Sequence, residues 1–179
     1  MANVRVYIAT SLDGYIAGPD DDLSWLPTEA GPGTDEALGF EAFMADVGAM
    51  LMGRRTYDVV RSLGEGWPYG ETPVLVATHR ELESDLPTVR AVSGSTDAVL
   101  DAALEEAGGR DVYLDGGAMV QAALEVGRVD ELIVTLVPVL VGGGVPLFGT
   151  LRERQEFVFE EHTSMGSMVQ LRARPKRGV

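Results

Sequence analysis

The sequence has no cysteine and few of the other side chains that bind metals or act as nucleophiles. The absence of cysteine from the 179 residues excludes disulfide bonds, thiolate metal sites, iron–sulfur clusters and cysteine nucleophiles. Lys176 is the only lysine and lies in the C-terminal tail, so we do not expect a Schiff-base mechanism. The two histidines, His79 and His162, are far apart, and neither has neighbours with the spacing of metal ligands. We therefore expect no bound metal.

Positive charge is also scarce, because 14 Lys and Arg residues face 28 Asp and Glu residues, which gives a formal net charge of −14. Nucleic acids and anionic membranes bind basic surfaces, so this balance argues against both as main partners. The composition, 45% hydrophobic and 23% charged, is typical of a folded globule, and the length fits a single domain over residues 1–179. Asp13 interrupts the first apolar stretch too early for an export signal, and we expect a cytoplasmic protein.

One uncharged segment, residues 132–151, has about the length of a membrane span. Its prolines and glycines, among them Pro138 and residues 142–144, would break a helix. Two buried strands around a glycine turn explain this segment better, and the first of them is expected to be a long strand over residues 132–141.

Apolar runs alternate with helical patterns through the middle of the chain, and strands dominate its end. We expect strands over residues 4–10, 15–17, 49–52, 73–78, 89–92, 111–114, 132–141, 157–159 and 168–172, the last two joined as a hairpin through residues 164–166. We expect helices from Thr34, over residues 56–63, from Ser95 or Thr96 to residue 107, and over residues 118–126. This order predicts an α/β fold with three layers (αβα), in which the central sheet is mostly parallel and antiparallel strands are added at its C-terminal side.

Three predicted strands are followed directly by residues that can bind phosphate. Residues 53–56, Gly-Arg-Arg-Thr, lead into a helix and offer free backbone N–H groups, two guanidinium groups and a hydroxyl. The adjacent glycines of residues 115–118, Asp-Gly-Gly-Ala, allow a backbone to approach a pyrophosphate closely. A third strand ends at residues 78–80, Thr-His-Arg. The alternatives are a helix start with solvated arginines for the first junction and a tight turn for the second.

Open α/β sheets bind ligands at the carboxyl ends of their strands, so three such junctions would suit an extended ligand with several phosphates. Arg54, Arg55 and Arg80 would supply the local attraction that the net charge of the protein opposes. Hydride transfer needs little covalent machinery, because the nicotinamide does the chemistry and the protein orients it. The sequence therefore allows a reductase more easily than a hydrolase.

Five motifs occur in a set order along the chain, at residues 11–17, 52–57, 115–118, 129–132 and 138–148. Together they resemble the dihydrofolate-reductase-like superfamily, and most closely the C-terminal reductase domain of bifunctional riboflavin-biosynthesis deaminase/reductases and its stand-alone relatives. The resemblance covers nearly the whole chain. It implies the dihydrofolate-reductase-like fold, a small heterocyclic substrate, NADPH as the cofactor and, commonly, a homodimer. The implied activity is related to that of 5-amino-6-(5-phosphoribosylamino)uracil reductase.

The same resemblance implies roles for individual residues. NADPH would be bound by Ala9, Thr10, Ile16, Gly53, Arg54, Arg55, Thr56, Thr78, His79, Arg80, Gly116, Gly117, Ala118 and Met119. Asp13 would face the substrate and is the candidate catalytic residue. Trp25 would also lie at the substrate end, unless it is a loop aromatic that only covers the core.

Two alternatives to this reductase hypothesis stay open. In true dihydrofolate reductases an acidic residue on the first helix holds the pterin, but spacing back from Gly53 leads to Ala37 or Gly39, where no carboxylate matches. Without it the donor groups of a pterin would be left unpaired, which weighs against dihydrofolate reduction. The other alternative is a non-catalytic NADPH-binding protein that keeps the fold and lacks a productive substrate pocket.

Overall fold

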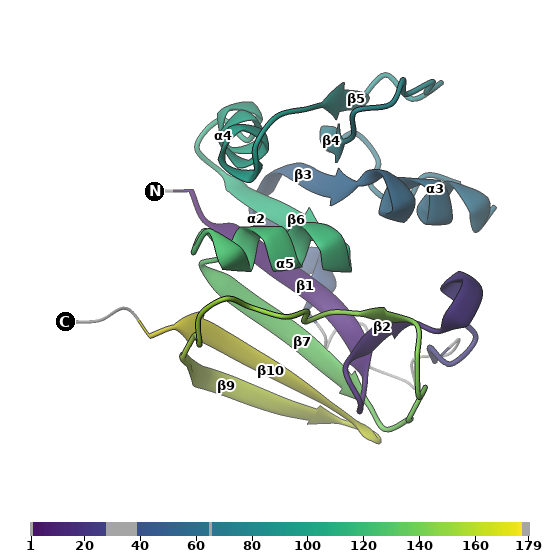
Figure 1. Ribbon diagram of the computed structural model, residues 1–179, viewed down its shortest axis with the longest axis vertical. Coiled ribbons are helices and arrows are strands. Elements are labelled where there is room, and N and C mark those ends of the chain that lie inside the picture. Colours follow the sequence, from purple (N-terminus) through teal and green to yellow (C-terminus); the bar gives the residue numbers. More distant parts are fainter. Residues whose placement is uncertain (1, 28–38, 65, 177–179) are drawn as a thin grey trace.

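The computed structural model describes residues 2–27, 39–64 and 66–176, which form an eight-stranded sheet with helices on both faces (Figure 1). The strands are β1 (Val4–Ser11), β2 (Tyr15–Ala17), β3 (Val47–Gly53), β4 (Val74–Ala77), β5 (Val89–Val92), β6 (Asp111–Asp115), β7 (Glu131–Val137), β8 (Val145–Pro146), β9 (Phe157–Met165) and β10 (Met168–Pro175). The helices are the single 3-10 turn η1 (Pro19–Asp21) and α2 (Phe40–Asp46), α3 (Arg54–Ser62), α4 (Thr96–Glu106) and α5 (Gly117–Glu125).

The order of strands in the large sheet is β5-β4-β3-β6-β1-β7-β10-β9. Every pairing from β5 to β7 is parallel, whereas β10 runs antiparallel to β7 and β9 antiparallel to β10. This arrangement confirms the predicted fold class, a mostly parallel sheet with antiparallel strands at its C-terminal side.

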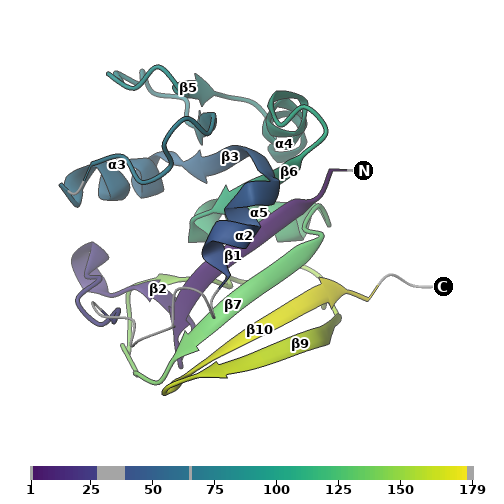
Figure 2. The ribbon, with the colours of Figure 1, turned by 180° about the vertical axis from the view of Figure 1, so that it is seen from behind.

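Alternation along the strands supplies a hydrophobic core on each face of the sheet. Leu51 of β3 points into the core beneath α4 and α5, while its neighbours Met50 and Met52 point into the core beneath α2. Figure 2 shows α2 lying across this second face. Phe43 of α2 packs there on Tyr113 of β6, with ring centroids 5.1 Å apart. Strands buried on both faces explain the nearly continuous apolar runs in the sequence.

The prediction for the uncharged segment 132–151 was wrong in its detail. β7 ends at Val137 rather than at residue 141, because Pro138 has no N–H to continue the ladder. The glycines of residues 142–144 do not join two buried strands, because Val145 and Pro146 of β8 are half-buried and exposed. Instead β8 pairs antiparallel with β2, and Gly144 lies so close to this pair that a Cβ there would collide with the carbonyl oxygen of Ala17.

Smaller boundary errors occur elsewhere. Helix α3 begins at Arg54, two residues before the predicted start, and β9 extends to Met165, so the hairpin turn falls at Gly166, where φ is +57°. The predicted cap Ser95 is confirmed, since its Oγ accepts a hydrogen bond from the Ala98 N–H at 3.2 Å. The predicted helix start at Thr34 lies outside the described residues, and α2 begins at Phe40, with Gly39 as its N-cap.

Within the ranges that the structure describes, no helix is both long enough and apolar enough to cross a membrane.

Candidate functional site

The three phosphate-competent junctions lie side by side at one edge of the sheet. They follow β4, β3 and β6, which are neighbours in the strand order. The pairing register makes these strands end level with one another, because Gly53 pairs with Ala77 and Met52 pairs with Asp115. Parallel strands therefore bring residues 53–56, 78–80 and 115–118 to the same edge.

Two glycines allow the junction at residues 53–56 to pack against the junction at residues 115–118. Gly116 has a φ of +86°, and a Cβ on it would collide with Oγ1 of Thr56. Gly117 is similarly enclosed, since a Cβ there would lie 2.6 Å from the carbonyl oxygen of Pro146 and 3.3 Å from Cδ1 of Ile16. Both glycines are buried. The close approach requires glycine at both positions, and it brings the predicted residues Thr56 and Ile16 to the Gly-Gly turn.

Helices α3 and α5 start at this edge with their N-terminal N–H groups not capped by a side chain. Gly53 precedes α3 and Gly116 precedes α5, and neither position contributes a side-chain hydrogen bond to the helix. The first turn of a helix carries N–H groups without intrahelical partners and the positive end of the helix dipole. The two helices therefore offer donors for an anion at adjacent positions.

A cavity of about 190 Å³ opens beside the junction that follows β4. Its polar lining includes Thr78 and His79, and Met119 of α5 closes one side. Ser93, Gly94 and Thr96, which also line it, come from the junction between β5 and α4. This fourth junction was missed in the sequence, although it has the same pattern of a strand followed directly by small polar residues and a helix.

The three arginines expected to bind phosphate differ in their surroundings. The Arg54 guanidinium donates at 2.8 Å both to Asp58 and to the carbonyl oxygen of Glu81, so it fastens α3 to the loop that follows β4. Arg55 is paired with Asp21 of η1. The Arg80 guanidinium, on an exposed side chain, has no ion pair or hydrogen bond within the described part of the chain.

Among the described residues, no cluster of His, Cys, Asp and Glu has the arrangement of a metal site. The acidic residues 20–22 are among those that do not form one.

The remaining predicted cofactor residues lie around this edge. Ala9 and Thr10 are near the carboxyl end of β1, with Thr10 fully buried and Ala9 half-buried. Ala118, in the first turn of α5, is exposed. Met119 is buried, and its Cγ would lie 3.7 Å from a Cβ placed on Gly53, which is an ordinary van der Waals separation.

Asp13 lies in the turn between β1 and β2 and connects it to the loop that follows β7. Its carboxylate accepts hydrogen bonds from the Ser11 hydroxyl at 2.6 Å and from the N–H groups of Val141 and Gly142 at 3.1 and 2.8 Å. The Ser11 hydroxyl and these N–H groups lower the pKa of Asp13. The geometry therefore favours a positioning role for Asp13, and a direct contact with substrate stays a prediction.

Trp25 is half-buried on the segment that follows η1, where its indole N–H donates to the carbonyl oxygen of Asp22 at 3.2 Å. This contact ties Trp25 to its own loop. Its proposed place at the substrate end also stays a prediction.

Asp115 is the notable residue that sequence reasoning did not assign to the site. It ends β6 just before the two glycines, and burial raises its pKa to about 6, although part of its surface is accessible. The Gly116 N–H donates to it at 2.8 Å and the Tyr69 hydroxyl lies 3.5 Å away, and both oppose the rise. The signal in the sequence was its position, a carboxylate at the carboxyl end of a buried strand next to a predicted phosphate loop.

Comparisons with known proteins agree on one family. The family model of the RibD C-terminal domain matches residues 2–171. The uncharacterized protein YwjB of Bacillus subtilis (strain 168) is 31% identical over 167 residues, which cover 93% of this chain and 94% of the relative. A putative riboflavin biosynthesis protein from Shewanella sp. PV-4 is 37% identical, with a TM-score of 0.86 over 99% of this chain and 100% of that one.

A more distant solved structure shares the fold. It is a diaminohydroxyphosphoribosylaminopyrimidine deaminase/5-amino-6-(5-phosphoribosylamino)uracil reductase from Thermotoga maritima, 18% identical, with a TM-score of 0.67 over 97% of this chain and 56% of that chain.

Proposed function

This chain belongs to the RibD C-terminal domain family of riboflavin-biosynthesis reductases with the dihydrofolate-reductase-like fold, and from that premise we propose that it is an NADPH-dependent reductase of a small heterocyclic substrate. The observation that carries the proposal is the adjacency of the three phosphate-competent junctions at one edge of the sheet. The substrate is proposed to be related to that of 5-amino-6-(5-phosphoribosylamino)uracil reductase, the activity named for the Thermotoga structure.

The residues at this edge fit a phosphorylated dinucleotide. The uncapped starts of α3 and α5 offer N–H donors for a pyrophosphate, and the enclosed pair Gly116 and Gly117 leaves the backbone approachable. The cavity beside Thr78 and His79 offers space and polar groups for the adenosine end. Arg80, which has no ionic partner in the described structure, is suited to a 2′-phosphate next to that cavity.

When bound, reduced nicotinamide supplies a hydride, and the substrate must gain a proton as well. The protein's part is to orient the two reactants, to exclude water and to handle that proton. We propose that Asp115 does the last, since its raised pKa allows it to hold a proton close to neutral pH. Tyr69, whose hydroxyl lies beside this carboxyl, is proposed to hold it in place.

Dihydrofolate reduction has less support than this proposal. Gly39, at one of the two positions where a pterin-binding acid was sought, is the N-cap of α2 and has no side chain to offer. Ala37 lies outside the described residues. A non-catalytic NADPH-binding protein stays an alternative, and the raised pKa of Asp115 favours an enzyme over it, because such shifts concentrate at active sites.

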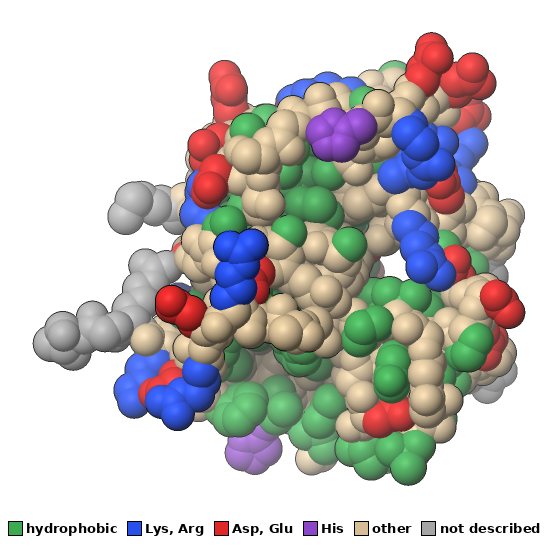
Figure 3. Space-filling model, in the orientation of Figure 1, with side chains coloured by type: hydrophobic (Ala, Val, Ile, Leu, Met, Phe, Trp, Pro, Cys, Tyr) green, Lys and Arg blue, Asp and Glu red, His purple; other side chains and the backbone are tan. Residues whose placement is uncertain are grey.

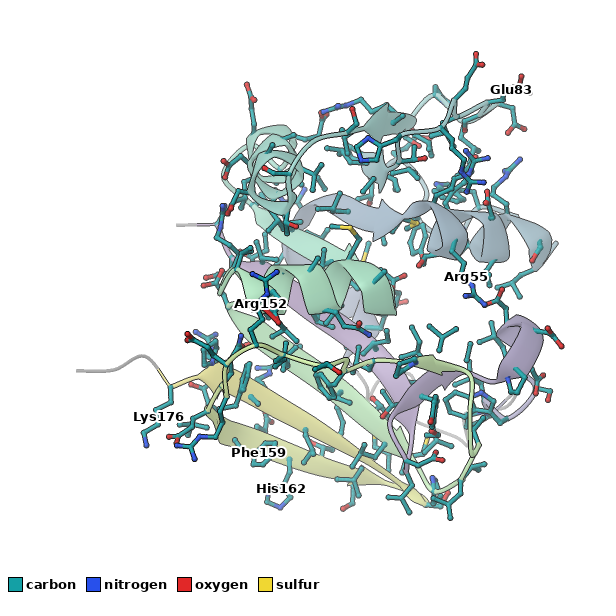
Figure 4. All side chains as sticks on the ribbon, in the orientation of Figure 1. Arg55, Glu83, Arg152, Phe159, His162 and Lys176 are labelled. Carbon is teal, nitrogen blue, oxygen red and sulfur yellow. The ribbon has the colours of Figure 1, made fainter. Side chains whose placement is uncertain are left out.

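Titration calorimetry with NADPH and NADH tests the proposal. We expect NADPH to bind at least tenfold more tightly, and we expect Arg80→Ala to remove most of this preference, because a charged hydrogen bond to the 2′-phosphate is worth about 1.5–3 kcal/mol. Arg152→Ala is the matched control, because its side chain is 92% exposed and lies on a different part of the molecule (Figure 4).

Equal affinity of the unmodified protein for the two dinucleotides would count against the proposal. If NADPH bound tightly and yet lost no hydride to any member of a panel of pyrimidines, pterins and carbonyl compounds, the non-catalytic alternative would replace it.

A homodimer also stays a prediction. It is supported by exposed apolar side chains, including Leu140, Phe148 and Phe159, and by β9, which has a partner strand on only one side in the large sheet. Figure 3 shows hydrophobic side chains gathered over the part of the surface near β9, β10 and the loop after β7.

A further inference from the structure

An ion pair joins η1 to the first turn of α3. Both Nε and Nη2 of Arg55 lie 2.8 Å from the same carboxylate oxygen of Asp21. Figure 4 shows the Arg55 side chain reaching from α3 toward the η1 turn. The residue that was expected to bind phosphate thus already binds an anion that the chain itself supplies.

The turn that presents Asp21 has an unusual backbone. Asp20 and Asp21 both have left-handed φ angles, +56° and +60°, which few residues other than glycine, asparagine and aspartate tolerate. The Gly18 N–H donates to the carbonyl oxygen of Asp22 at 2.7 Å and the Asp22 N–H donates to that of Pro19 at 3.2 Å, and these two bonds close the turn. Asp21 therefore reaches α3 from a backbone conformation that is uncommon for residues with a Cβ.

The surroundings leave room for Arg55 to change partners. Its side chain is 65% exposed, and the space between η1 and α3 is a groove of about 600 Å³ that both residues of the pair line. An exposed ion pair of this kind is worth only about 0.2–1 kcal/mol, so that a dinucleotide pyrophosphate at the start of α3, which carries two negative charges over its two phosphates, can compete for the guanidinium.

We propose that Asp21 is an internal competitor for the anion site, which holds Arg55 until a phosphate of the dinucleotide displaces it. This inference rests on the proposed function, because it takes the ligand of α3 to be a dinucleotide phosphate. Dinucleotide binding then releases η1 from α3. The loop that follows β2 carries both η1 and Trp25, and Trp25 is hydrogen-bonded to the end of η1 through the carbonyl oxygen of Asp22, so this whole loop gains freedom when the cofactor binds.

The effect on affinity follows from the worth of the pair. Removing the competing carboxylate with Asp21→Asn should tighten NADPH binding about two- to fivefold, which corresponds to the upper part of the range for an exposed pair. Asparagine accepts the left-handed backbone, so the turn is kept. Asp20→Asn is the matched control, because it removes the same charge from the neighbouring left-handed residue, which has no described contact with Arg55.

A double-mutant cycle separates the pair from general charge effects. In the background of Arg55→Ala, Asp21→Asn should no longer change NADPH affinity beyond what Asp20→Asn does. Calorimetric titration of the unmodified protein, the three single variants and Arg55→Ala/Asp21→Asn gives all the required constants. A protein that binds no NADPH at all would refute the proposed function, whereas binding with no difference between Asp21→Asn and Asp20→Asn would refute only the competition.

Hydrogen exchange gives a second readout, measured without and with NADPH. Amides of residues 18–27 should exchange faster in Asp21→Asn and Arg55→Ala than in Asp20→Asn or the unmodified protein, and NADPH should speed their exchange in the unmodified protein. Weaker NADPH binding by Asp21→Asn would mean that Asp21 orients Arg55 for the phosphate, and it would overturn the proposal. Slower exchange of residues 18–27 on NADPH binding would overturn it as well.

Discussion

Replacing Asp115 by asparagine should make the protein more stable at neutral pH and less active. Burial raises the folded-state pKa of Asp115 from 3.8 to about 6, so keeping it ionised in the folded protein costs free energy. A rise of about two units corresponds to about 3 kcal/mol, and because part of the side chain is accessible we expect between about 2 and 3 kcal/mol. The asparagine carbonyl can still accept the Gly116 N–H bond.

The pH dependence of this gain has a definite sign. Between about pH 4 and pH 6 the unfolded chain has lost the Asp115 proton while the folded protein still holds it, so the unfolding free energy of the unmodified protein falls as pH rises through this window. The difference between Asp115→Asn and the unmodified protein should therefore be small near pH 4 and reach its full size above about pH 6.

Urea unfolding followed by tryptophan fluorescence from pH 4 to pH 8 measures this difference, and other carboxylates cancel in the comparison. A variant less stable than the unmodified protein at pH 7, or a difference that does not change with pH, would show that Asp115 is not held at a cost. If the variant were stabilised and kept full reductase activity, the proposal that the Asp115 carboxyl group transfers the proton would be wrong.

Two further substitutions test the edge of the sheet and its opposite end. Gly116→Ala should cost about 1–3 kcal/mol of stability and abolish NADPH binding in calorimetry, because φ at this position is +86° and the new Cβ would displace Thr56. Gly143→Ala is the control and should have neither effect, because its φ is not positive and the space around it is open. Arg5→Met should cost about 1–3 kcal/mol in urea unfolding, since Glu131, which is 2% exposed, loses Arg5 Nε at 2.6 Å and keeps Arg174 at 3.1 Å. Arg5→Met/Glu131→Leu should recover part of the loss, and no recovery would contradict the assignment of the cost to a buried charge.

Much of the fold could be read from the sequence because each buried strand carries its own signal. The apolar runs that became β3, β4 and β6 are enclosed on both faces, so each is a nearly continuous apolar stretch that can be recognised as a strand. The segment after β7 was misread because its apolar residues lie partly at the surface: Leu140 is 71% exposed and Phe148 is 47% exposed. Hydrophobicity alone cannot distinguish a residue that enters a core from one that covers an outer surface.

The candidate site likewise has features that could be predicted from the sequence and features that could not. Glycine-rich junctions were recognised because their backbone demands are local, and Gly116 does have the positive φ that a special turn requires. The pairing of Arg55 with Asp21 could not be predicted, since it joins residues 34 positions apart and depends on how η1 is placed against α3. Asp115 belongs to the motif of residues 115–118, but the raised pKa of its carboxyl group follows from its burial beside Tyr69, which the sequence does not reveal.

The two carboxyl groups at this edge have been given opposite environments. Asp13 follows β1 and Asp115 ends β6, two adjacent strands, yet donors that converge on Asp13 lower its pKa while burial raises that of Asp115. A carboxylate held by three donors is ionised throughout the neutral range, so its value lies in fixing the loops that it joins. A carboxyl with a pKa of about 6 exchanges its proton in that range, and this separation of the two acids supports the proposal that Asp13 positions loops while Asp115 transfers the proton.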